Sequence, residues 1–210
     1  MSGKKLIPHC YITKISFFSE SSASINILSQ EGLIRVIALS FTKKYDYDLS
    51  YCLRSLCSVE VIDSSQNLYL SRLSFEKPFE IPGHRLYLLL FIRDLTDYLA
   101  VQYFSTKIFN AYNRFFDLLE KHSDEDYYYY ALISYQLLFM ELAGLGSASV
   151  QLRTLFTDNV LSLQEIENFY LKKLTFSSFM KIQNMIDSFL EQDLGYVRPR
   201  DYFSIWSKVV

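Results

Sequence analysis

The chain has 210 residues, of which half are hydrophobic and 17% are aromatic, and its formal net charge is -2. This composition excludes a disordered chain, and the length is enough for one large or two small domains with proper cores. The charge is uneven, because residues 1–45 carry six Lys and Arg against two Glu. A basic N-terminal part is compatible with an anionic partner, although a solvated basic face is the simpler explanation.

Residues 10–39 predict three antiparallel strands. Apolar, β-rich runs are joined by short polar turns at 18–22 and 29–32. Within the second run, Ile25 and Ile27 alternate with Ser24, Asn26 and Leu28, as expected for a strand with one buried face.

Two further strands are predicted over residues 49–62 and 68–75, on either side of a turn at 63–67. No helix in this part looks long enough to cross over the sheet. Five strands in so short a segment predict a small sandwich or closed barrel, and a five-stranded Greek-key barrel of the OB type is the most economical candidate.

Two prolines and a glycine within residues 76–83 end the sheet, and the apolar period then changes from two to about 3.6. Helices are predicted over 86–99, 108–119, 123–142 and 175–190, with a further capping box at 162–165. The expected fold is therefore α+β, with an OB-type barrel over 1–80 and an all-α domain over 81–210.

The three cysteines, Cys10, Cys52 and Cys57, have no framework spacing and predict reduced thiols. Cys52 and Cys57 are five apart in a predicted strand, which would place them on opposite faces. No signal peptide is visible, and the longest apolar run is too short to span a bilayer. We expect a cytoplasmic protein.

Catalytic machinery is not apparent. The histidines His9, His84 and His122 are scattered, and no nucleotide-binding, hydrolase or metalloprotease motif occurs. Gly144 and Gly146 follow a predicted helix and are typical of a C-cap. No enzyme activity, cofactor or metal is expected.

A nucleic-acid interface is easier to motivate, because cations on a barrel can follow phosphates while aromatic rings stack on bases. Ordinary surface positions would explain the same residues equally well. The candidate contacts are Lys14, Arg35, Lys43, Lys44, Arg54 and Arg72.

Residues 18–22 and 31–35 resemble the N-terminal barrel of the bacterial DNA repair protein family RecO, which reads roughly Y-x-E-x-S, an alternating strand and E-x-G-x-x-R. The resemblance continues through most of the chain in order, although each motif is short. It includes residues 86–99, 108–119, 136–146 and 194–200.

The resemblance implies a non-enzymatic recombination mediator of the nucleoid. Members of the family bind single- and double-stranded DNA, anneal complementary strands coated by single-stranded DNA-binding protein (SSB), and with RecR help to load RecA. A protein-interaction scaffold with the same fold and weak DNA binding is the competing interpretation, supported by the acidic second domain.

Three departures from the family bear on these expectations. The basic stretch after the third strand is thinner here, at residues 38–44, and no cysteine follows Cys57, so the zinc of many members is not expected. The family's arginine for the acidic SSB tail is replaced near Tyr135. The residues that could substitute for it are Arg93, Arg114 and Arg153.

Overall fold

A computed structural model describes residues 3–44, 49–64, 66–121, 124, 126–146 and 174–196. The chain divides into two compact units, Met1–Ile81 and Pro82–Val210. The division falls inside the Pro- and Gly-containing segment 76–83. The first unit holds all the described strands, and the second holds the long helices.

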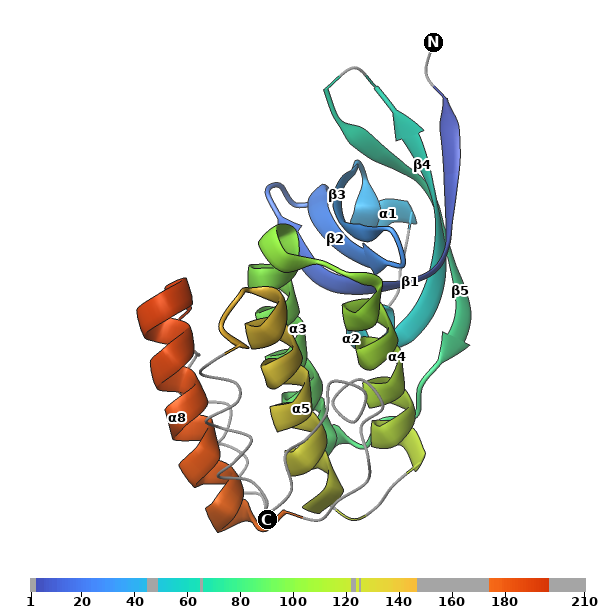
Figure 1. Cartoon of the computed structure of the whole chain (residues 1–210). Coiled ribbons are helices and arrows are strands. Elements are labelled where there is room, and N and C mark those ends of the chain that lie inside the picture. Colours follow the sequence, from blue (N-terminus) through green and yellow to red (C-terminus); the bar gives the residue numbers. More distant parts are fainter. Residues whose placement is uncertain are drawn as a thin grey trace. The chain divides into compact units, whose positions relative to one another are not determined.

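The first unit is a five-stranded closed barrel with the strand order β1-β2-β3-β5-β4 (Figure 1). Its neighbours pair antiparallel except β3 and β5, which are parallel and meet at the single bridge Ile37–Tyr69. The strands are β1 (Lys4–Phe17), β2 (Ala23–Ser29), β3 (Gly32–Ala38), β4 (Ser55–Asp63) and β5 (Leu68–Pro78).

The alternation predicted for β2 is confirmed, and β3 also has buried and more exposed positions. Ile25, Ile27 and Val36 are buried, whereas Asn26 is half-buried and Arg35 is exposed. The two strands pair over their full lengths, so every second side chain enters one apolar interior, and burial of these side chains is the main stabilising contribution.

Strand β1 begins six residues earlier than residue 10, where the first β-rich run starts. The strand runs through Pro8 and His9 with a register shift between Ile7 and Cys10. His9 has a positive φ of 47°. A bulge accommodates a proline that cannot donate to the sheet, which is why the strand survives it.

The single strand predicted over 49–62 is wrong. Leu49–Leu53 forms the short helix α2, and β4 begins only at Ser55. Apolar residues at 49, 52 and 53 also fit one face of a helix, and a run this short does not distinguish the two periods. Cys52 and Cys57 consequently do not face opposite sides, because both are buried in the same barrel core. A second short helix, α1 (Phe41–Lys44), follows β3.

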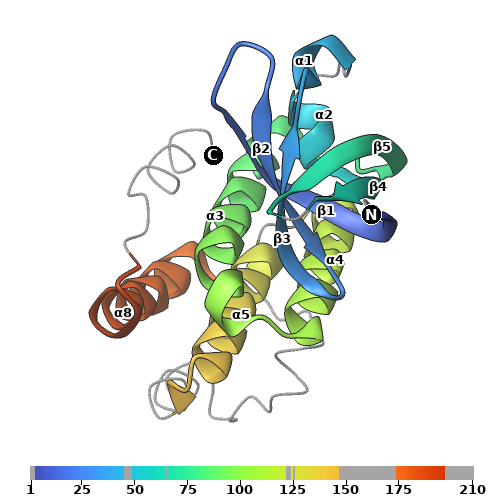
Figure 2. The same ribbon diagram turned by 90° about the horizontal axis from the view of Figure 1, so that it is seen from above.

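The second unit is built from packed helices. A 3-10 turn, η1 (Gly83–Arg85), leads into α3, and α5 lies between α4 and α8 in both views (Figures 1 and 2). The four long helices are α3 (Leu86–Tyr103), α4 (Thr106–Lys121), α5 (Asp126–Leu142) and α8 (Phe176–Leu194). All four were predicted, with ends that differ by a few residues, whereas the capping box at 162–165 lies outside the described residues.

Side-chain caps and glycines mark several of the helix ends that the structure describes. At the start of α5, Asp124 Oδ1 accepts a hydrogen bond from the Asp126 N–H at 3.1 Å, and Thr175 caps α8 in the same way. Gly144 and Gly195 follow α5 and α8 with φ angles of 83° and 67°. That left-handed conformation favours glycine and closes the last turn.

Arg93 corrects a prediction about α3. It was a candidate for contact with an acidic tail at the surface, but its side chain is only 6% exposed. The buried arc of α3 is wide, since it extends from Phe91 through Leu88 to Arg93 itself. A helix enclosed in this way has little solvated face for a charged residue.

Candidate nucleic-acid interface

Two of the predicted DNA contacts lie together on the outer face of the barrel. Asn26 of β2 pairs with Lys14 of β1 on one side and with Arg35 of β3 on the other. Lys14 and Arg35 are exposed. Since neighbouring strands are about 5 Å apart, the two cationic residues start from backbones roughly 10 Å apart. We call these three residues the β1–β3 row.

Neither cation of the β1–β3 row pairs with a carboxylate of the described residues. The Arg35 Nε donates to Asn26 Oδ1 at 3.4 Å, which orients the guanidinium over the sheet without neutralising it. Other barrel cations differ: Lys4 Nζ lies 2.8 Å from Glu60 Oε1, and Lys5 Nζ lies 2.6 Å from Glu31 Oε2. The row is therefore a place where positive charge remains available to an anion.

Arg72 lies on another part of the barrel surface. It is exposed on β5 opposite Glu60 of β4. The pKa of Glu60 is lowered, first by the hydrogen bond from Lys4 and then by the one from Ser71, with a smaller contribution from the charge of Arg72. Because Arg72 shares its surroundings with this carboxylate, it offers an anion less net charge than the β1–β3 row does.

The remaining predicted contacts are Arg54, Lys43 and Lys44. Arg54 follows α2, is half-buried, and its Nε is buried without a hydrogen-bond partner in the described structure. Lys43 and Lys44 are the last residues of α1, and their side chains lie outside what the structure describes.

A cleft of about 670 Å³ opens beside the row. Its walls come from the β1–β2 turn, the outer face of β2 and β3, and the β4–β5 turn. The β2–β3 cleft is lined by Phe18, Ser24, Arg35, Ile37, Asp63, Ser64, Gln66, Asn67 and Leu68.

No protein-family model matches this chain, and no curated protein is significantly similar to it. The functional assignment therefore depends on its residues and on the geometry of the barrel.

Among the described residues, no group of three or more His, Cys, Asp and Glu could hold a metal ion. No helix within the described ranges is long and apolar enough to cross a membrane.

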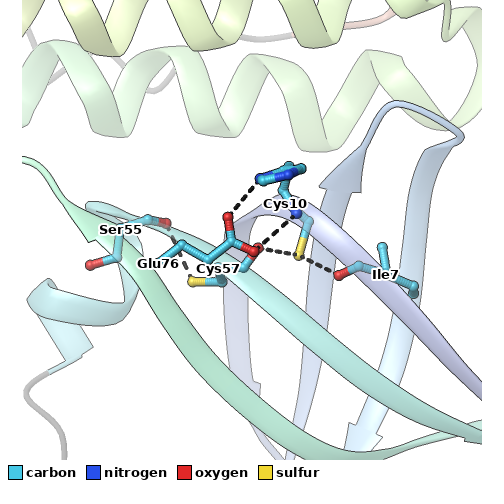
Figure 3. A network of polar contacts seen from close by, with 6 residues as sticks. Ile7, Cys10, Ser55, Cys57 and Glu76 are labelled. Atoms are coloured by element: carbon cyan, nitrogen blue, oxygen red, sulfur yellow. Dashed lines mark hydrogen bonds and ion pairs between the residues drawn. The ribbon is translucent and has the colours of Figure 1, made fainter.

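The three thiols belong to the barrel interior. Cys10 and Cys57 face each other across β1 and β4, and the Cys10 thiol donates to the carbonyls of Cys57 and Ile7 at 3.3 and 3.6 Å (Figure 3). Burial raises the pKa of Cys10 to about 12 and that of Cys57 still further, with the nearby Glu76 carboxylate adding to both. Thiols kept protonated in this way are poor nucleophiles and suit a structural role.

The proposed SSB-tail arginines are not equivalent. Arg93 is buried, so it cannot receive a peptide at the surface, whereas Arg114 is exposed on α4. Arg153 lies outside the described residues.

Arg85 was not identified from the sequence. Its Nη1 donates to the Leu119 carbonyl at 2.8 Å. Arg85 holds the C-terminal end of α4, where a cation complements the helix dipole.

Phe18 and the β4–β5 turn were also missed as site residues. The sequence marked both segments as turns, but nothing in it showed that they border one cleft. Phe18 is 62% exposed and lines the cleft. That exposure is the feature that distinguishes it as a candidate contact.

Proposed function

We propose that this chain is a RecO-like recombination mediator that binds DNA through its barrel. In this proposal it binds single and double strands, anneals complementary strands coated by SSB, and acts with RecR in loading RecA at the nucleoid. It carries out no chemical step and needs no cofactor.

The barrel topology supports an OB-type assignment. Its strands follow the order β1-β2-β3-β5-β4, and the short helices α1 and α2 lie between β3 and β4. OB-folds bind oligonucleotides on the face of strands 2 and 3, between the loops that join strands 1 to 2 and strands 4 to 5. The β2–β3 cleft is bounded by these same segments.

The observation that carries the proposal is the β1–β3 row, where Lys14 and Arg35 flank Asn26 and neither pairs with a carboxylate of the described residues. A phosphate backbone releases counterions when it meets such cations, and this release favours binding at low salt. Neutralised phosphates also reduce the repulsion between two strands, so base pairing can drive annealing without a catalytic residue.

An interaction scaffold that binds DNA weakly is the second candidate. Its support is that Lys4 and Lys5 are both paired with carboxylates, which leaves the barrel with fewer available cations than its composition suggests. On the second unit, the exposed Arg114 is the remaining described candidate for an acidic SSB tail.

An annealing assay tests the proposal. Two complementary labelled strands are mixed at low salt, with and without SSB, and the rate of duplex formation is followed by energy transfer. The wild-type chain is expected to accelerate annealing, and Lys14→Ala combined with Arg35→Ala is expected to remove most of the acceleration.

The matched control removes two exposed cations from the helical unit, Lys107→Ala with Lys181→Ala. It carries the same change of net charge and should anneal like the wild type. No acceleration by the wild-type chain, or equal losses in the two double variants, would contradict annealing through the β1–β3 row.

A further inference from the structure

The β2–β3 cleft has two chemically different walls. On the sheet side, Arg35 is exposed beside Ser24 and Ile37. On the opposite side, the β4–β5 turn contributes Asp63 and the amide side chains of Gln66 and Asn67. A phosphate is attracted to the first wall and repelled by the carboxylate of the second.

The β4–β5 wall suits the edge of a base. Ser64 and Asn67 close the turn through two backbone hydrogen bonds of 3.0 and 3.2 Å, and the Ser64 hydroxyl donates to the Asn67 carbonyl at 2.9 Å. The described structure gives no partner to the side-chain amides of Gln66 and Asn67. Amides and carboxylates are among the groups that hydrogen-bond base edges.

Two adjacent phenylalanines differ in their position relative to the cleft. Phe18 lines it and is 62% exposed, whereas Phe17 does not line it and packs its ring 6.2 Å from that of Phe41. Phe17 is still 44% exposed. The chain therefore contains a candidate stacking residue and, next to it, a control of identical chemistry.

We propose that the β2–β3 cleft receives one unpaired nucleotide, with its phosphate on Arg35 and its base stacked on Phe18 with the base edge toward the β4–β5 turn. This inference rests on the proposed DNA binding and deepens it by making the barrel selective for single strands. Bases in a duplex have both faces covered by their neighbours, and exposing one costs unstacking energy. Duplex DNA then uses only the phosphate contacts of the β1–β3 row.

The test compares affinities for a fluorescent single-stranded oligonucleotide and its blunt duplex in the full chain. Phe18→Ala should weaken single-strand binding roughly tenfold, as expected for the loss of one base-stacking contact, and leave duplex binding nearly unchanged. Because Phe18 carries no charge, the salt dependence of both affinities should stay as in the wild type. Phe17→Ala should leave both affinities unchanged.

Arg35→Ala separates this inference from the proposed function. It should weaken both ligands and lower the salt dependence of each, since it removes a phosphate contact. If the wild type binds neither ligand, the proposed function fails. If it binds both and Phe18→Ala weakens them equally, or not at all, the nucleotide site is wrong while DNA binding stands.

Discussion

The two units differ in which of their large polar and charged side chains are buried. In the barrel, the charged groups of β1 to β3 lie at the surface, and Lys14 and Arg35 remain without carboxylate partners in the described structure. In the helical unit, polar and charged side chains such as Arg85, Gln136 and Gln183 are buried.

This difference separates binding from stability. A buried polar group is costly unless it is hydrogen-bonded, so the buried polar groups of the helical unit hold its helices in one arrangement. An exposed cation contributes little to the free energy of folding and is available to a ligand. We therefore expect substitutions in the helical core to change stability, and substitutions in the β1–β3 row to change DNA affinity.

The sharpest case in the helical unit is a pair of buried amides. Gln136 of α5 and Gln183 of α8 donate to each other at 2.8 and 2.7 Å, and both are fully buried. Gln183→Leu leaves the Gln136 carbonyl oxygen without its donor, which should lower the free energy of unfolding by about 1–3 kcal/mol. Urea unfolding followed by far-UV circular dichroism measures the change.

Two further variants make this prediction specific. Gln136→Leu combined with Gln183→Leu should recover much of the loss, because two apolar side chains then replace a satisfied pair. Gln192→Leu changes an exposed position of the same helix and should stay within about 0.5 kcal/mol of the wild type. If Gln183→Leu is no less stable than Gln192→Leu, the amide pair does not fix the packing of α8.

The barrel thiols predict a loss of stability at alkaline pH. Burial raises the pKa of Cys10 from 9.0 to about 12 in the folded barrel, whereas in the unfolded chain the thiol ionises near its ordinary value. Its contribution is therefore complete below about pH 9 and is lost as the pH rises toward 12. Between pH 7.5 and 9.5 the loss should be about 1 kcal/mol for Cys10, and Cys57 should add a similar amount.

Denaturant unfolding at the two pH values tests this for the wild type and for Cys10→Ala with Cys57→Ala. The double variant should lose less stability between the two pH values than the wild type loses. A decrease of the same size in both proteins would show that other groups cause the alkaline effect.

Local patterns in the sequence predicted much of the fold. Ile25 and Ile27 alternate with Ser24 and Asn26, so one strand period fits them, and Gly144 follows its helix as expected. The prediction failed where a local signal was ambiguous or overridden. Residues 49–53 fit both the helix period and the strand period, and they form a helix. Strand β1 begins before Pro8 because its first residues pair with β4.

The site was only partly predictable, for a different reason. Lys14 and Arg35 were candidates from composition and from the predicted strands, but only the register shows that Asn26 joins them into one row. Phe18 and Asn67 are far apart in sequence and border one cleft because the barrel closes. Arg93 could not be excluded in advance, because its burial depends on how other helices pack around α3.

The most direct test of the account is the salt dependence of single-strand binding. The affinity of a short fluorescent oligonucleotide is measured across salt concentrations for three proteins: the wild type, Lys14→Ala with Arg35→Ala, and Lys5→Ala, whose cation is already paired with Glu31. The double variant should bind much more weakly at low salt, with a slope of log K against log salt reduced by about 1.4, whereas Lys5→Ala should stay close to the wild type. An unchanged slope and affinity in the double variant would contradict the assignment of the β1–β3 row as the DNA contact.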